Sequence, residues 1–438
     1  MTHFQSISNK RAYLCVPAKP NLSQVPKLLL LAFGLLLLGL PSTQLAAQVD
    51  RSESEVEAEE LTGLAKIIES LTLRPNKKRA ALDSNIYASK LVFAPYVLFT
   101  PETSFGFGVG GSFQFKLPNS GDETRTRTST IPIAFTYTVE NQILFFSGFE
   151  IFSPDEKWVL SGNARAQVFP RLFYGVGRDT DEDNEEIFES SQIILEPILS
   201  KQLFIDKLFI GAGLRYRHVA STDFENENTD ENGARLPSQF VDAGISGANG
   251  STSVGGELAA LYDTRNSLLN AQTGTYLEAT FGRYGNFLGG THEYNLIRYD
   301  LRHFMQLKGD EDWRDVLALN TRGYFSNGDV PLVDLAKLGS SEIMRGYYEG
   351  RYTSNNLLAA QAEYRLNFEN SPWGAVGFAS VGDVAPDVGD FSLNNLRGAF
   401  GVGVRLMVDP LERLNLRLDV AFTAEGDINP YIVIGEAF

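Results

Sequence analysis

Apolar and polar residues alternate along most of the chain from Leu91 onward. In Leu414–Thr423, Leu, Leu, Leu, Val and Phe alternate with Asn, Arg, Asp, Ala and Thr. The same period-two pattern recurs in Leu208–Arg217, Leu358–Phe368 and Phe400–Val408. Segments of about ten residues with one apolar and one polar face are typical of strands that span an outer membrane. A soluble sandwich also alternates, but it does not usually place so many charges on one face of strand after strand.

This alternation predicts an all-β chain of sixteen strands. They lie near 90–99, 104–117, 128–138, 141–153, 156–169, 187–201, 204–219, 250–264, 274–285, 291–308, 313–325, 355–369, 372–383, 397–409, 412–424 and 428–438. An even number places both ends of the chain on one side, and closure removes the strand edges that lipid does not tolerate. We therefore predict a transmembrane antiparallel β-barrel over residues 89–438, with both termini in the periplasm.

The connections between these strands predict the orientation of the barrel. Long polar connections at 170–186, 220–249 and 326–354 each join an odd strand to the next even one. Outer-membrane barrels carry their long loops on the extracellular side. The connection at 118–127 disagrees, because it is long for a periplasmic turn, and it suggests a misplaced strand.

The first 47 residues have the anatomy of a cleaved signal peptide. The apolar run Leu28–Leu40 has 13 residues, which is short of the roughly 20 that a spanning helix needs. We predict cleavage before Gln48. Cys15, the only cysteine, precedes the apolar run, so neither a lipid anchor nor a thiol is expected in the mature chain. The residues that make the leader basic are Lys10, Arg11, Lys19 and Lys27.

Residues 48–88 form a separate segment of 41 residues. An acidic stretch is followed by apolar residues at helical spacing and then by a basic run. We predict a short periplasmic amphipathic helix and a linker, with a solvated tether as the alternative. The apolar positions are Leu61, Leu64, Ile68 and Leu71.

Composition adds a charge constraint. The chain has 38 Lys and Arg against 54 Asp and Glu, a net charge of −16. Loss of the leader, which holds four basic and no acidic residues, changes this charge to −20. Such a chain is not expected to bind nucleic acid through a broad basic face.

Residues 339–368 contain the sequence Met344-Arg345-Gly346-Tyr347, which resembles the Val-Arg-Gly-Phe/Tyr motif of the BamA/TamA superfamily, the barrels of the bacterial surface antigen type. Tyr262–Asn266 with Gly274–Glu278 is similar to the strand-loop-strand signature that precedes this motif, and Gly401–Leu406 to a near-terminal strand. Ile434–Phe438 resembles the C-terminal assembly signal, for which we single out Tyr431, Gly435 and Phe438.

The resemblance implies that the motif loop folds into the barrel and that Arg345 meets acids on the next two strands. Glu363 lies on the polar face of the first strand and is the expected partner. Ser380 stands where the second acid is expected, and offers only a neutral hydrogen bond. Because Gln361 and Arg365 also face inward, we expect a wet lumen and a partly screened ion pair.

The resemblance also implies a role in outer-membrane biogenesis, by protein insertion or translocation through a weak seam between Leu91–Thr100 and Tyr431–Phe438. Partners would be outer-membrane lipid, unfolded outer-membrane or exported polypeptides, and periplasmic or lipoprotein partners. The family's periplasmic POTRA domains, which receive client chains, are not expected in a 41-residue segment. The alternative is therefore a passive pore or structural barrel without an assembly role.

Three other signals lead to no predicted site. Gly106, Gly108 and Gly111 match GxGxxG, but a strand follows them where a dinucleotide site needs a helix. The acids at 179–183 fail the calcium-loop pattern at its sixth and twelfth positions. His303 has no accompanying serine motif, so a phospholipase is not expected. We predict no enzyme, no metal and no cofactor.

Overall fold

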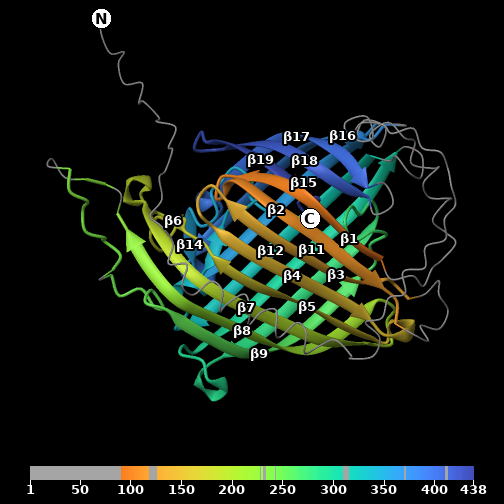
Figure 1. The fold of residues 1–438 in the computed structure, drawn as a ribbon, viewed down its shortest axis with the longest axis horizontal. Helices are drawn as coiled ribbons and strands as arrows, with labels where there is room; N and C mark the ends of the chain where they lie inside the picture. Colours follow the sequence, from red (N-terminus) through yellow and green to blue (C-terminus); the bar gives the residue numbers. More distant parts are fainter. Residues whose placement is uncertain are drawn as a thin grey trace, which may run out of the picture.

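The computed structural model describes residues 90–438 except 118–125, 227, 230–232, 242, 309–314, 369–370 and 410–412. Within these residues, sixteen antiparallel strands close into a barrel, with the strands tilted around a common axis (Figure 1). The predicted signal peptide and amphipathic helix lie outside the described residues. No helix among the described residues is long and apolar enough to cross a membrane.

Each predicted strand corresponds to one strand of the barrel wall. The wall strands are β1 Lys90–Thr100, β2 Ser104–Phe115, β3 Ser129–Thr138, β4 Ile143–Phe152, β5 Trp158–Val168, β7 Glu186–Gln202, β8 Leu208–Glu225, β9 Ser251–Asp263, β10 Gly274–Tyr284, β11 Tyr294–Lys308, β12 Asp315–Gly328, β15 Asn356–Asn367, β16 Trp373–Ala385, β17 Arg397–Asp409, β18 Leu414–Thr423 and β19 Ile428–Ile434. The predicted fold class is confirmed.

Two predicted strand ends and the suggestion of a misplaced strand are wrong. β8 continues to Glu225, six residues beyond its predicted end. The alternation of apolar and polar residues stops earlier, but the polar residues that follow still pair with β7. The last strand ends at Ile434, four residues earlier than predicted. The long connection before β3 does not mark a misplaced strand, because β2 and β3 pair directly from Gly106↔Thr138 to Phe115↔Ser129.

The two faces of the wall differ as the alternation predicts. On β17, Phe400 and Val402 are exposed on the outer face, whereas Arg405 is 4% exposed and faces the lumen. Leu358 and Leu418 are exposed on the outer face in the same way. An outer band of exposed Leu, Val and Phe side chains suits contact with hydrocarbon.

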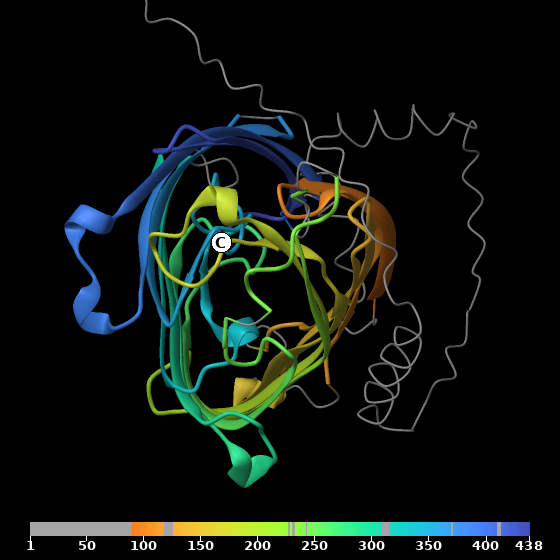
Figure 2. The same ribbon diagram turned by 90° about the vertical axis from the view of Figure 1, so that its left-hand side faces the viewer.

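The long connections gather at one end of the barrel, which we call the long-loop end. They include β6 Arg171–Phe173, which pairs with β7, and the hairpin of β13 Ala336–Leu338 and β14 Tyr352–Ser354. Viewed from this end, several of these segments lie inside the ring of wall strands (Figure 2). The short 3-10 turns are η1 Pro154–Glu156, η2 Glu182–Asn184, η3 Asn286–Leu288, η4 Leu332–Asp334, η5 Val388–Asp390 and η6 Leu393–Asn395.

The barrel closes between its first and last strands, and this seam is short. Among the described residues, β1 and β19 share the single register pair Phe99↔Ile432. By contrast, β1 pairs with β2 from Lys90↔Gln114 to Thr100↔Ser104. Fewer paired backbone groups make the seam the weakest lateral contact of the wall, because ladder hydrogen bonds hold adjacent strands together.

Candidate functional site

The connection between β12 and β15, residues 329–355, lies inside the barrel, and we call it the inner loop. It contains η4 and the β13–β14 hairpin, which pairs from Ala336↔Ser354 to Leu338↔Tyr352. Its apolar residues pack against wall residues of β15, β16 and β17. The buried residues of this contact are Ala336, Leu338, Ile343, Met344, Tyr347, Tyr352, Leu357, Ala359, Val384 and Ala399. The inner loop is therefore part of the packed interior.

The motif Met344-Arg345-Gly346-Tyr347 forms a tight turn at the tip of this loop. Met344 and Gly346 have φ values of 54° and 112°, a region that L side chains rarely adopt. A Cβ atom at Gly346 would also lie 3.1 Å from Thr423 Cγ2. Two side chains of β19 hold the backbone of this turn. Gly346 N donates to Tyr431 Oη at 2.9 Å, and Gly346 O accepts from Asn429 Nδ2 at 2.6 Å.

Arg345 is completely buried and contacts two carboxylates. Its Nη2 donates to Glu363 on β15, and its Nη1 donates to Asp419 Oδ2 on β18 at 2.7 Å. The guanidinium carbon also lies 3.6 Å from the centre of the Phe378 ring on β16. The structure thus brings together the predicted partners Arg345 and Glu363. Arg345 and Glu363 are 0% exposed, so the expected wet and screened environment is wrong.

The two acids also contact other arginines, and together they form what we call the β15–β18 charge cluster. Arg365 Nε donates to Glu363 Oε2 at 2.9 Å, and Arg405 Nη1 donates to Asp419 Oδ1 at 2.6 Å. The cluster contains four arginines and three acids, a net charge of +1. Its members are Arg345, Glu363, Arg365, Arg405, Arg417, Asp419 and Glu436.

Ser380 does not take the role predicted for it. Its hydroxyl donates to the backbone oxygen of Ala399 at 3.4 Å, whereas the guanidinium of Arg345 donates to Glu363 and Asp419. The second acid is Asp419, two strands further along the wall. Inward-facing glycines of β17 leave space for the groups that contact Arg345. A Cβ atom at Gly403 would lie 2.0 Å from Asp419 Oδ1, and one at Gly401 would lie 2.3 Å from the Phe378 ring. Asp419 carried one signal in the sequence, its inward parity in Leu414–Thr423, but parity does not reveal which strand it leans across.

A second anchor, missed by the sequence interpretation, holds the other end of the inner loop. Asp334 accepts from Arg215 Nη2 at 2.9 Å and from Arg217 Nη1 at 2.7 Å, both on β8. Ser253 on β9 and Tyr294 on β11 donate to its other oxygen at 2.6 and 2.9 Å. Burial alone would raise the pKa of Asp334, but Arg217 and Arg215 bring that pKa well below its ordinary value.

The two anchors have opposite polarity and lie on different parts of the wall. At one, a loop cation meets wall acids on β15 and β18, and at the other a loop acid meets wall cations on β8. A buried charge without its partner is costly. The pair of anchors therefore holds the inner loop across the lumen in one position.

The C-terminal residues also lie inside the barrel, which corrects their predicted place in a wall strand. After β19 the chain turns at Gly435, with φ of 96°. Phe438 packs with Phe304 and Val316, and its backbone oxygen accepts from Arg365 Nη2 at 2.9 Å. Tyr431 is part of the inner-loop contact described above. Within the described residues, no group of three or more His, Cys, Asp or Glu side chains could hold a metal ion.

Comparisons with known proteins agree with this architecture. A family model described as the Omp85 superfamily domain matches residues 133–438. The fold is similar to the crystal structure of BamA from Haemophilus ducreyi lacking POTRA domains 1–3, at 11% identity and a TM-score of 0.51, with 86% of this chain and 82% of that chain covered. It is also similar to CdiB from Acinetobacter baumannii, at 11% identity and a TM-score of 0.50, with 80% of this chain covered and 65%, less than two thirds, of that one. No curated protein sequence matches the chain.

Proposed function

Because the chain belongs to the Omp85 superfamily, the resemblance to BamA/TamA barrels is confirmed, and we propose that it acts in biogenesis of the bacterial outer membrane. The barrel would lie in the outer membrane of a Gram-negative cell and help to insert or translocate polypeptide. Its partners would be membrane lipid, client polypeptides and periplasmic or lipoprotein factors. The proposal includes no catalytic step.

The single observation that carries this proposal is the short seam. β1 and β19 share one register pair, Phe99↔Ile432, among the described residues. A wall that separates there would expose the edges of β1 and β19, and an exposed edge is a template for an incoming strand. A client strand could then pair with this edge while its apolar face enters lipid.

The inner loop supports the same proposal. Its anchors lie on β8 and on β15 to β18, so neither depends on the seam strands β1 and β19 for its ion pairs. Separation of β1 from β19 would leave both anchors in place. The loop would thus keep the remaining wall in register while the seam opens.

One observation favours the alternative, a passive pore. The lumen contains polar chambers of about 810 and 580 Å³, and Arg165, Glu196 and Arg298 line both. A polar interior is what a channel for small solutes needs.

Locking the seam with a disulfide distinguishes the assembly role from the passive pore. Phe99→Cys with Ile432→Cys places thiols on directly opposed residues, whose spacing in an antiparallel pair suits a disulfide. We expect the oxidised variant to lose folded levels of other outer-membrane barrels in cells that depend on it, with recovery on reduction. The matched control is Val402→Cys with Val420→Cys, an opposed pair within the closed wall. Unchanged barrel levels with a locked seam, together with a solute-permeability defect on depletion, would refute the assembly role and support the pore.

A further inference from the structure

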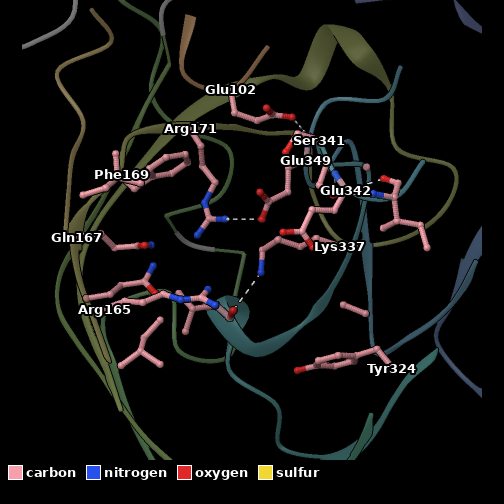
Figure 3. A pocket seen from close by; sticks show the side chains of 18 of the residues that line it. Glu102, Arg165, Gln167, Phe169, Arg171, Tyr324, Lys337, Ser341, Glu342 and Glu349 are labelled. Atoms are coloured by element: carbon pink, nitrogen blue, oxygen red, sulfur yellow. Dashed lines mark hydrogen bonds and ion pairs between the residues drawn. The ribbon is translucent and has the colours of Figure 1, made fainter. Parts of the chain in front are cut away.

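A polar chamber of about 810 Å³ lies between the inner loop and wall strands that include β1, β4, β5, β7, β8, β11 and β12. Seven cationic and four acidic side chains line it, whereas the chamber of about 580 Å³ is lined by five of each. Figure 3 shows Arg165 and Gln167 entering the larger chamber from β5 and Arg171 from β6, with Lys337 and Glu349 entering from the inner loop. The excess of positive charge therefore belongs to the larger chamber.

Four of its seven cations already have acidic partners. Arg215 and Arg217 pair with Asp334, as described above. Arg298 Nη2 lies 2.8 Å from Glu257 Oε1, and Arg322 Nη1 lies 2.8 Å from Glu342 Oε2. The excess charge is thus carried by the other three, Arg165, Arg171 and Lys337.

These three side chains have weak or neutral partners. The side chain of Arg165 has no hydrogen bond or ion pair within the described part of the chain, and only stacks over the Phe146 ring at 5.6 Å. Arg171 Nη1 is 3.9 Å from Glu349 Oε1, too far for a hydrogen bond. Lys337 Nζ donates to two backbone oxygens of the inner loop, at 3.0 and 3.2 Å.

The acids near them do not balance this charge. Glu349 is the acid closest to Arg171, and its backbone N donates to Glu102 Oε1 at 2.8 Å. Burial, with a smaller contribution from Glu349, raises the pKa of Glu102. Burial, then Arg171 and Arg217, lowers the pKa of Lys337 to about 7. Crowded cations that lose charge in this way are stabilised by an added anion.

We propose that this chamber binds a soluble anion with phosphate groups, held by Arg165, Arg171 and Lys337. Guanidinium groups match pairs of phosphate oxygens, and Lys supplies a compact third charge. Two or three positive charges facing one carboxylate suit a polyanionic phosphate better than a single carboxylate. This site goes beyond the proposed role in biogenesis and does not depend on it.

Titration of the purified full chain in detergent with inorganic pyrophosphate, at constant ionic strength and with chloride as the reference anion, tests the site. We expect one saturable site by calorimetry. Arg165→Gln should weaken it about tenfold, because one charge-assisted contact is lost. Arg165 has no hydrogen-bonded partner to lose, so this variant should fold normally, which heat-modifiable mobility on gels checks. Lys337→Met should weaken binding to a similar degree.

The matched control is Arg302→Gln, which removes a lumenal cation from the smaller chamber and should leave the affinity unchanged. Absence of saturable binding would overturn the proposal. So would affinity that falls equally in the control, since this indicates a general charge effect. Binding of short-chain phosphatidic acid without binding of pyrophosphate would replace the soluble ligand by a lipid headgroup.

Discussion

Arg345 is held by two carboxylates, and each of these also contacts a second arginine. The β15–β18 charge cluster has one more arginine than acids. Loss of Arg345 therefore leaves equal numbers of arginines and acids, whereas loss of one acid doubles the excess of arginines from one to two. The role of a residue in such a cluster depends on this balance as well as on its own contacts.

We predict that Glu363→Gln destabilises the barrel more than Arg345→Ala does. The acid variant leaves unbalanced buried arginines and should cost about 3–5 kcal/mol, the range for a broken buried pair, and Arg345→Ala should cost less. Thermal unfolding in detergent of both variants and of the double variant measures the two costs and their coupling. Equal costs would contradict the charge-balance argument, and zero coupling would refute the ion pair.

We predict that Asp334→Asn frees the other end of the inner loop. Arg217 would lose its carboxylate partner while its side chain stays half-buried, and loop residues near η4 should become accessible to protease. The low pKa of Asp334 means that its stabilising effect is present above its ordinary pKa and is lost only as pH falls through the depressed value. The wild-type loop should therefore resist protease equally at pH 7 and pH 5. Acid-induced cleavage in this range would contradict the assignment.

At the scale of elements, β17 shapes the Arg345 site because it has glycines, without side chains, at inward-facing positions. Its inward glycines leave room for the Phe378 ring from β16 and the Asp419 carboxylate from β18. Both groups reach Arg345 across a strand that contributes no bulk at these positions. The same steric argument explains why glycines alternate with larger residues in the near-terminal sequence Gly401–Leu406.

We predict that Gly403→Ala disrupts the Arg345 site. The added methyl group would lie 2.0 Å from Asp419 Oδ1, so the carboxylate must move away. The inner loop should become more sensitive to protease, and unfolding in detergent should shift by about 1–3 kcal/mol, the usual cost of overpacking. Gly377→Ala on β16 is the control, because no atom lies within 4 Å of its added methyl group. Similar behaviour of the two variants would exclude the steric explanation.

The C-terminal residues form a second element that enters the lumen. Phe438 is 7% exposed and packs with Phe304, Val316 and Ala318. We predict that Phe438→Ala lowers the stability of the folded barrel by about 3 kcal/mol or more, the lower end for a large buried aromatic. Heat-modifiable gel mobility and detergent unfolding report this loss. Unchanged stability with reduced abundance in cells would instead indicate that Phe438 acts only as an assembly signal.

At the scale of the whole molecule, closure by sixteen wall strands places the three longest connections, between β5 and β7, β8 and β9, and β12 and β15, at one end. Asn228 lies in the connection between β8 and β9 at this end, and Asp206 lies in the turn between β7 and β8 at the other. Both residues are exposed. The distribution of loop lengths predicts that the long-loop end faces the cell exterior.

We predict that Asn228→Cys reacts with an impermeant thiol reagent on intact cells, whereas Asp206→Cys reacts only after the outer membrane is breached. Mass-tag gel shifts measure both reactions. Each variant is the control for the other, because both carry one exposed thiol on the same barrel. Labelling of Asp206→Cys alone on intact cells would reverse the orientation, and labelling of both would reject a single one.

The wall of the barrel was predictable from the sequence alone. Strand geometry sends successive side chains to opposite faces, so an apolar and a polar environment leave a period-two record in each segment. This local rule gave the sixteen strands, their faces and the inward parity of Glu363. It also marked the long connections, because they interrupt the alternation. The motif around Arg345 identified the loop tip, and its predicted partner Glu363 was found in contact with it.

The contacts inside the lumen were decided only by the tertiary structure. They depend on strand register, on tilt and on the path of the inner loop, none of which is encoded in the alternation of any one strand. Asp419 reaches Arg345 across two glycines of a neighbouring strand, and Asp334 meets arginines more than a hundred residues earlier in the chain. Phe438 turns inward after Gly435 although its sequence continues a strand-like pattern. Long-range pairing of charges is a property of the closed barrel, because only closure brings these side chains within hydrogen-bonding distance.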